Sequence, residues 1–219
     1  MRVDVLTLFP EVILGPLNES IVKRAREKGL LNVNVVNIRD FAQDKHRTVD
    51  DTPYGGGAGM VLKVDVLYRA VSSVLSDNCQ IVLMTPGGRK YDQGVATELA
   101  RVEHMIILCG HYEGYDERIR EILNPLCLSI GDYILTNGAL AAAVVIDSIA
   151  RLLPGSLGNT QSVSEESYML EGTLKYPQYT RPREFMGKVV PQVLLSGDHQ
   201  QISRWRAEQA GKRTDEFKI

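Results

Sequence analysis

The sequence predicts an α/β protein with a largely parallel sheet flanked by helices, followed by a small, mostly helical C-terminal domain. Three observations lead to this prediction. Short, continuous apolar runs at 81–84, 105–109 and 126–130 are typical of strands buried on both faces. Segments with helical spacing of apolar residues separate these runs, as in folds built from a parallel sheet. A polar, Gly/Ser-rich segment then precedes a basic C-terminal region.

The N-terminal elements follow the same alternation. An alternating strand at 3–8 is ended by the Phe9-Pro10 step. We expect one helix over 11–28, because Gly29 stops it and one face is apolar, with Ile13, Leu17, Ile21 and Ala25. A second strand fits 33–38.

Helices are expected between and after the later strands, at 64–75, 92–102, 116–123 and 139–153. The last of these is apolar almost all round. Such a helix is buried either between other elements or in a subunit interface.

The chain is expected to divide into a main domain over 1–158, a flexible linker over 159–172 and a small basic helical domain over 173–219. In the small domain, Asp198 is predicted to cap a helix that ends at Gly211. Residues 173–219 carry 9 Lys/Arg against 5 Asp/Glu, a net charge of +4, whereas residues 1–172 carry −6. This asymmetry favours a polyanionic partner for the tail, with a solvated surface as the alternative.

Composition and missing motifs exclude several classes of protein. With 44% hydrophobic and 24% charged residues in 219, the chain is of the ordinary globular type. No apolar run approaches the roughly 20 residues of a membrane span, and no signal-peptide pattern is present, so we expect a cytoplasmic protein without a membrane partner. The three separated cysteines indicate reduced thiols. Nucleotide-binding P-loop and dinucleotide motifs are absent from the sequence.

Three glycine-containing segments follow the buried strands: MTPGGRKYDQG from Met84, LCGHYEGYDER from Leu108 and LSIGDYILTNGAL from Leu128. Ligands of α/β proteins bind beyond the carboxyl ends of strands. Three such turns, free of bulky side chains, can approach a flat ligand and bind its edge through main-chain groups. A ligand site is therefore favoured over plain turns, which remain the alternative.

A further segment, at 40–60, has neither helical nor strand periodicity and contains DKHRTVDDTPYGGGAGM. Loops of about 20 residues are uncommon in compact domains and are usually functional or disordered. Its glycines suit a clamp that brings backbone against a phosphate or a base, with Lys45, His46 and Arg47 as counter-charges. Disorder is the alternative.

Taken together, these motifs carry a resemblance. DDTPYGGGAGM, CGHYEGYDERI, SIGDYILTNG, RLLPGSLGN and PQYTRP, in this order and spacing, resemble the TrmD family of bacterial tRNA (guanine-N1)-methyltransferases of the SPOUT superfamily over nearly the whole chain. The resemblance implies a trefoil-knotted α/β fold, a homodimer and S-adenosylmethionine as methyl donor. It also implies tRNA as partner, methylated on N1 of the guanine immediately 3′ of the anticodon, and a requirement for Mg²⁺ at residues that the sequence does not indicate.

Carried over by motif, the resemblance assigns site residues. The donor pocket falls on Leu83, Met84, Thr85, Pro86, Gly110, Tyr112, Glu113, Gly114, Ile130, Gly131, Asp132, Tyr133, Ile134, Leu135, Thr136, Asn137 and Gly138, with the positive sulfonium near Glu113 and Asp132. The tRNA contacts fall on Asp50, Tyr54, Gly55, Gly56, Gly57 and Gly59 at the target guanine, and on Arg204, Arg206, Lys212 and Arg213 of the basic domain.

The implied catalytic pair is Glu166, where the family usually has aspartate, with Arg151. Guanine N1 carries a proton, so a base must remove it while negative charge develops on O6. Glu166 is the predicted base, with Glu165 as its rival, and Arg151 is the predicted partner of O6. Without the resemblance, Arg151 would complement a helix dipole and Glu166 would be a solvated charge.

Two other functions remain open at this point. One is a SPOUT-fold RNA-binding protein without catalysis, and the other is a methyltransferase that acts on a different nucleoside.

Overall fold

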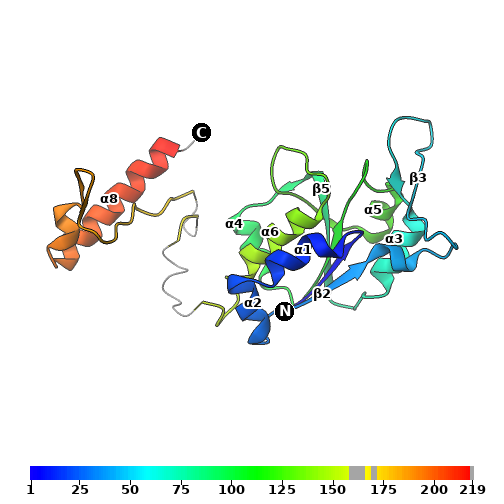
Figure 1. The fold of residues 1–219 in the computed structure, drawn as a ribbon, viewed down its shortest axis with the longest axis horizontal. Helices are drawn as coiled ribbons and strands as arrows, with labels where there is room; N and C mark the ends of the chain where they lie inside the picture. The colour runs from blue at the N-terminus through cyan, green and yellow to red at the C-terminus, as the bar shows by residue number, and fades with distance from the viewer. Residues whose placement is uncertain (158–165, 169–171, 218–219) are drawn as a thin grey trace. The chain divides into compact units, whose positions relative to one another are not determined.

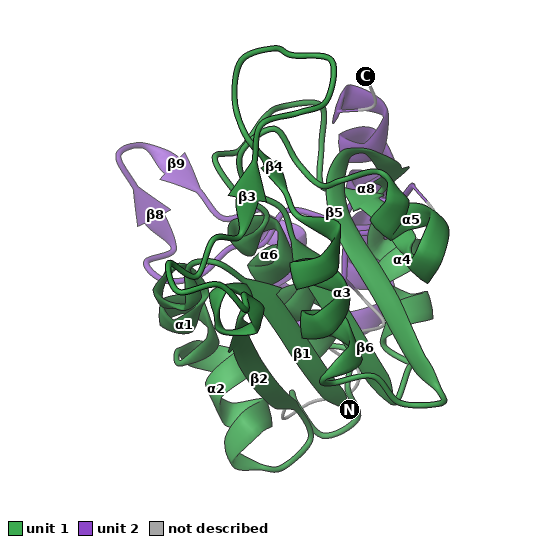
Figure 2. Cartoon of the chain, turned by 90° about the vertical axis from the view of Figure 1, so that its right-hand side faces the viewer, with its two compact units in different colours: residues 1–158 green, residues 159–219 purple. Residues whose placement is uncertain are grey.

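The computed structural model describes residues 1–157, 166–168 and 172–217, which belong to two compact units, Met1–Gly158 and Asn159–Ile219 (Figures 1 and 2). Most of the expected linker therefore lies outside the described residues. Within it, the structure describes 166–168 and Gly172 alone.

Unit 1 contains a five-stranded sheet in the order β2-β1-β6-β5-β7, and every pairing in it is parallel. Its strands are β1 (Arg2–Thr7), β2 (Asn32–Asn37), β5 (Cys79–Lys90), β6 (His104–Cys109) and β7 (Leu126–Ser129). The central strand β6 is buried at every residue, as its continuous apolar run predicts. The α/β class is thus confirmed, whereas the knot implied by the resemblance stays a prediction.

Helices cover both faces of this sheet (Figure 1). One face packs against α1 (Pro10–Leu17), α2 (Ser20–Glu27), α4 (Gln93–Leu99) and α6 (Ala139–Ala150). The other packs against α3 (Val64–Ser72), α5 (Arg118–Leu123) and the short 3-10 helix η1 (Ile38–Phe41). Alternate strand residues enter the two cores, so Val5 and Ile107 lie in the first and Leu6 and Ile106 in the second.

The single helix expected over 11–28 is wrong, because the chain breaks between α1 and α2. Glu19 is extended there, with φ −126° and ψ 159°. The break resets the helical phase, so Val22 is buried with Ala25 while Ile21 is only half-buried.

The glycine-rich segment is a long loop closed by a two-stranded antiparallel pair. Its strands are β3 (Asp50–Asp51) and β4 (Val61–Leu62). The remaining loop residues between the strands have no regular structure, as expected.

Unit 2 contains a β8 (Glu184–Phe185) and β9 (Lys188–Val189) hairpin, the 3-10 helix η2 (Gln192–Leu195) and the long helix α8 (His199–Phe217). Asp198 caps α8 as predicted, since its Oδ1 accepts from the backbone N–H groups of Gln200 and Gln201 at 2.9 and 3.0 Å.

The prediction that α8 ends at Gly211 is wrong. The last turns are held by Thr214, whose hydroxyl donates to Ala210 O and accepts from Leu174 N. Thr214 is the only buried residue among those described in unit 2. Nowhere in the described chain is a helix both long and apolar enough to cross a membrane.

Candidate functional site

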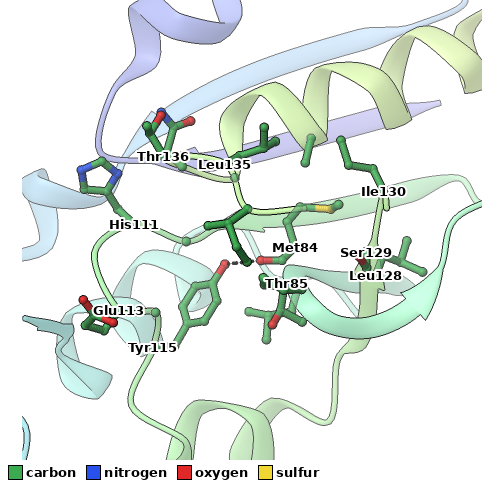
Figure 3. A pocket seen from close by; sticks show the side chains of 18 of the residues that line it. Met84, Thr85, His111, Glu113, Tyr115, Leu128, Ser129, Ile130, Leu135 and Thr136 are labelled. Carbon is green, nitrogen blue, oxygen red and sulfur yellow. Dashed lines mark hydrogen bonds between the residues drawn. The ribbon is translucent and has the colours of Figure 1, made fainter. Parts of the chain in front are cut away.

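A cavity of about 500 Å³ lies at the carboxyl ends of β6 and β7 and beside the middle of β5, where the three glycine-containing segments come together (Figure 3). Parallel strands end at the same edge of a sheet, so loops far apart in the sequence meet there. The cavity is lined by sixteen of the residues assigned to the donor pocket: Leu83, Met84, Thr85, Pro86, Gly110, Tyr112, Glu113, Gly114, Ile130, Gly131, Tyr133, Ile134, Leu135, Thr136, Asn137 and Gly138.

Asp132 does not line this cavity. Its carboxylate lies on the surface and pairs with Lys90 at the end of β5, with 2.6 Å between Oδ2 and Nζ. Of the two acids expected near the sulfonium, Glu113 is the one that lines the cavity.

Close backbone contact explains why glycines stand at the junction of the loops. The N–H of Gly138 donates to Gly110 O at 2.8 Å. A Cβ on Gly138 would lie 2.9 Å from Gly110 N and 3.0 Å from Cys109 Cα, closer than real Cβ atoms approach backbone. A Cβ on Gly110 would meet the ring and hydroxyl of Tyr115 at 2.8 Å.

Tyr115 is a lining residue that the sequence analysis missed. Its hydroxyl is 3.0 Å from Met84 O, in the middle of β5, as Figure 3 shows. It is also 3.0 Å from Leu108 O, near the end of β6. Burial raises the pKa of the phenol well above its ordinary value, so it stays protonated and can donate its single hydrogen to either carbonyl. The GYDER motif contained this residue, but only the packing reveals its contacts.

Six further lining residues were not predicted: His111, Glu117, Arg120, Leu128, Ser129 and Ala141. The ring of His111 contacts the rings of Phe9 and Tyr112, with centroids 4.9 and 4.5 Å away. Its Nδ1 is buried without a hydrogen-bond partner among the described residues. A buried nitrogen of this kind can bond to a ligand or a water in the cavity.

The walls fit the expected methyl donor. Main-chain groups of glycines and apolar side chains from β7 and α6 suit a flat heterocycle, whereas Glu113, Glu117 and Arg120 add charges for a polar ligand.

The loop between β3 and β4 joins this cavity directly. Glu113 N donates to Met60 O, and Leu62 N donates to Gly114 O, both at 3.0 Å. Gly59 packs so closely on the Glu113 side chain that a Cβ would overlap it. The loop and the cavity therefore share a wall.

The residues assigned to the target guanine all lie on this hairpin. Asp50 is half-buried in β3, and Tyr54 at the loop tip is fully exposed. The four glycines adopt positive φ values between 78° and 126°, which favour glycine: Gly55, Gly56, Gly57 and Gly59.

The implied catalytic pair is divided between the two units. Arg151 is exposed at the C-terminal end of α6 in unit 1. Glu166 is half-buried in unit 2, beside Ser167, whose hydroxyl accepts from Lys175 N at 2.9 Å. Neither unit contains both residues, and the rival base, Glu165, lies outside the described residues.

The four cations assigned to the basic domain differ in their surroundings. Arg204 is exposed, and the Arg206 guanidinium lies over the Tyr176 ring at 4.7 Å. Lys212 pairs with Glu208 at 2.6 Å. Arg213 is half-buried and donates to Lys175 O at 3.2 Å, which ties α8 to the preceding segment.

For Mg²⁺, the described part of the chain offers no group of three or more His, Cys, Asp or Glu side chains that could hold a metal ion. The described residues therefore do not fit the expected metal.

Comparisons with known proteins identify the family of the chain. A family model described as tRNA (Guanine-1)-methyltransferase TrmD matches residues 1–219. The chain is 56% identical to the tRNA (guanine-N(1)-)-methyltransferase of Moorella thermoacetica over 218 residues, which cover 98% of this chain and 87% of the relative. It is 53% identical to the protein of the same name from Geobacillus kaustophilus over 216 residues, 98% of this chain and 88% of the relative.

A third relative with this name, from Carboxydothermus hydrogenoformans, is 52% identical over 210 residues, 96% of this chain and 83% of the relative. Because the family model covers the whole sequence and these relatives cover nearly all of it, the chain belongs to the tRNA (guanine-1)-methyltransferase TrmD family.

Proposed function

We propose that this protein transfers a methyl group from S-adenosylmethionine to N1 of guanine in tRNA, at the guanine immediately 3′ of the anticodon. The observation that carries the proposal is the cavity at the ends of β6 and β7 and beside the middle of β5. It is built from the segments that resemble the tRNA (guanine-1)-methyltransferase TrmD family, to which the chain belongs. The donor, when bound, supplies an electrophilic methyl group on a positively charged sulfur.

In this proposal, the loops hold the donor mainly through backbone. Glycine at 110 and 138 lets main-chain N–H and C=O groups reach the edge of the heterocycle. Leu128, Ile130 and Ala141 provide apolar contact, and the carboxylate of Glu113 offsets the sulfonium charge.

The β3–β4 loop positions the guanine beside the donor, because Gly59 and Met60 contact the same Glu113 that lines the cavity. Tyr54 is exposed at the loop tip and can stack on RNA. Orientation of this kind brings the two reacting atoms together before the chemical step.

Glu166 removes the N1 proton, and Arg151 binds O6 as negative charge develops there. A carboxylate is a weak base toward the N–H of guanine N1. Positioning and O6 stabilisation therefore provide most of the rate enhancement.

The proposed enzyme is a homodimer that acts in the cytoplasm, where tRNA is found. One observation supports the dimer. Helix α6 exposes Leu140 and Val144 one turn apart, with relative exposures of 44% and 48%, and a second copy of the chain would cover this apolar surface.

The proposal is tested by donor binding and product mapping. Isothermal titration calorimetry should detect S-adenosylmethionine binding, and mass spectrometry of a tRNA transcript after reaction should locate one methyl group on N1 of the predicted guanine. A methyl group on another nucleoside would indicate a different specificity. RNA binding without methyl transfer would indicate a non-catalytic protein.

A further inference from the structure

We propose that the ion pair of Glu117 and Arg120 binds the amino-acid end of S-adenosylmethionine, with Arg120 on the α-carboxylate and Glu117 on the α-ammonium. This inference rests on the proposed function, since it assumes that the cavity holds this donor. Both residues line the cavity, and neither belongs to the set assigned by the resemblance.

The charges around the cavity limit the choice of carboxylate partner. Among the described residues that line it, Arg120 is the only lysine or arginine. Glu113 and Glu117 are the acidic lining residues. The donor carries a sulfonium, an ammonium and a carboxylate, so one cation and two acids in the lining match its three charges.

The geometry of the pair matches a zwitterion. Glu117 and Arg120 stand one turn apart at the start of α5, with 2.9 Å between Glu117 Oε1 and Arg120 Nη1. Their side chains remain accessible, at 68% and 49% relative exposure, so a ligand can approach them. An arginine fork has five N–H donors, and it can bind a second carboxylate while one nitrogen stays on Glu117.

A zwitterion placed against this pair forms a square of alternating charges. The carboxylate and the ammonium of the donor then each face an opposite charge. Glu117 and Arg120 each keep an opposite charge beside them when the donor binds. Glu113 is left for the sulfonium, because its side chain lies against Gly59 of the loop that would present the guanine.

The test compares how each variant binds a ligand with the amino-acid end and one without it. Calorimetry measures the affinities of wild-type protein, Arg120→Gln and Glu117→Gln for S-adenosylmethionine and for 5′-methylthioadenosine, which lacks both the amino-acid end and the sulfonium charge. Both variants should bind S-adenosylmethionine about tenfold more weakly and 5′-methylthioadenosine unchanged, at the lower end of the range for charged hydrogen bonds because the pair is partly exposed.

Decarboxylated S-adenosylmethionine separates the two roles. It keeps the ammonium, so Glu117→Gln should still weaken its binding. It lacks the carboxylate, so wild-type protein and Arg120→Gln should bind it equally. Arg120→Lys should recover part of the affinity for S-adenosylmethionine.

Arg118→Gln is the matched control. Arg118 lies on the same helix and pairs with Asp116 at 2.6 Å, but it does not line the cavity. It should leave all affinities unchanged. The inference is overturned if Arg120→Gln has no effect, weakens both ligands equally or behaves like Arg118→Gln. Wild-type protein that binds neither ligand would instead contradict the proposed function.

Discussion

At the scale of single residues, the contact between Gly138 and Gly110 decides whether the cavity can form. Gly138→Ala should weaken S-adenosylmethionine binding by about ten- to a hundredfold, because the new Cβ would force apart two backbone segments that are 2.8 Å apart at their hydrogen bond. Calorimetry measures the effect, and a thermal unfolding scan checks that the variant folds.

Gly87→Ala is the control for this change, since a Cβ there meets nothing within 4 Å. Unchanged donor affinity in a folded Gly138→Ala protein would show that the loop junction does not form the binding site.

Glu166 can be tested as the base that removes the N1 proton. Glu166→Gln should lower the single-turnover rate by about a hundredfold or more while donor and tRNA affinities stay nearly intact, because a general base acts mainly in the transition state. Rapid-quench kinetics at saturating substrates gives the rate.

Two variants accompany this measurement. Glu166→Asp restores the usual residue of the family and should retain activity, with some loss from its shorter reach. Glu165→Gln should remain active. If Glu165→Gln is inactive and Glu166→Gln is active, the base is Glu165 and not Glu166.

Sequence motifs identified most of the lining residues but not all their contacts. The glycine-containing segments could be predicted from the sequence, because a glycine just after a continuous apolar run is a local signal for a turn at the end of a strand. Tyr115 and Arg120 stand in the same GYDERIR run, yet their role depends on which strand ends and which helix face meet across the cavity. Asp132 could not be recognised as an outward residue, because its partner Lys90 lies far away in the sequence.

At the scale of elements, α8 presents cations with unequal freedom to bind RNA. The double variant Arg204→Gln, Arg206→Gln should weaken tRNA binding and flatten its salt dependence, since each lost phosphate contact removes up to about 0.7 to 0.9 from the log–log slope. Binding isotherms from 50 to 200 mM salt measure this slope.

The double variant Lys23→Gln, Arg24→Gln is the matched control, because it also removes two exposed cations, from α2 of unit 1. An equal change in slope from the two double variants would mean that α8 has no special role. Arg213→Gln should instead destabilise unit 2, because Arg213 ties α8 to Lys175.

Elements were predictable where their pattern was local. β6, β7 and the first half of β5 follow from continuous apolar runs. The turn expected after Met84 is wrong, because β5 continues to Lys90, where Arg89 and Lys90 pair with β7. The break between α1 and α2 could not be predicted, because a helical pattern of apolar residues continues across it. Gly211 also failed as a stop signal, because Thr214 anchors the turns beyond it.

At the scale of the whole molecule, the proposed dimer would combine Arg151 of one chain with Glu166 of the other. Light scattering should report about twice 24.3 kDa. Leu140→Asp, Val144→Asp should give an inactive monomer, because two charges would replace the exposed apolar stripe of α6. An active wild-type monomer would contradict the proposal.

Mixing two inactive variants tests whether sites are shared. Arg151→Ala and Glu166→Gln chains, unfolded and refolded together in equal amounts, should recover about a quarter of wild-type activity, because half of the dimers are mixed and each has one intact site. No recovery would mean that both residues of a site come from one chain.

The scarcity of buried residues in the described part of unit 2 has a consequence for how firmly this unit is folded. With Thr214 alone buried in its described part, little apolar surface opposes local opening. Amide protons of α8 should exchange with deuterium orders of magnitude faster than those of β6, and bound tRNA should slow them. Equal protection in both elements without tRNA would refute this. Part of the free energy of tRNA binding would then be used to order α8, so that the measured affinity understates the contacts that the folded unit makes.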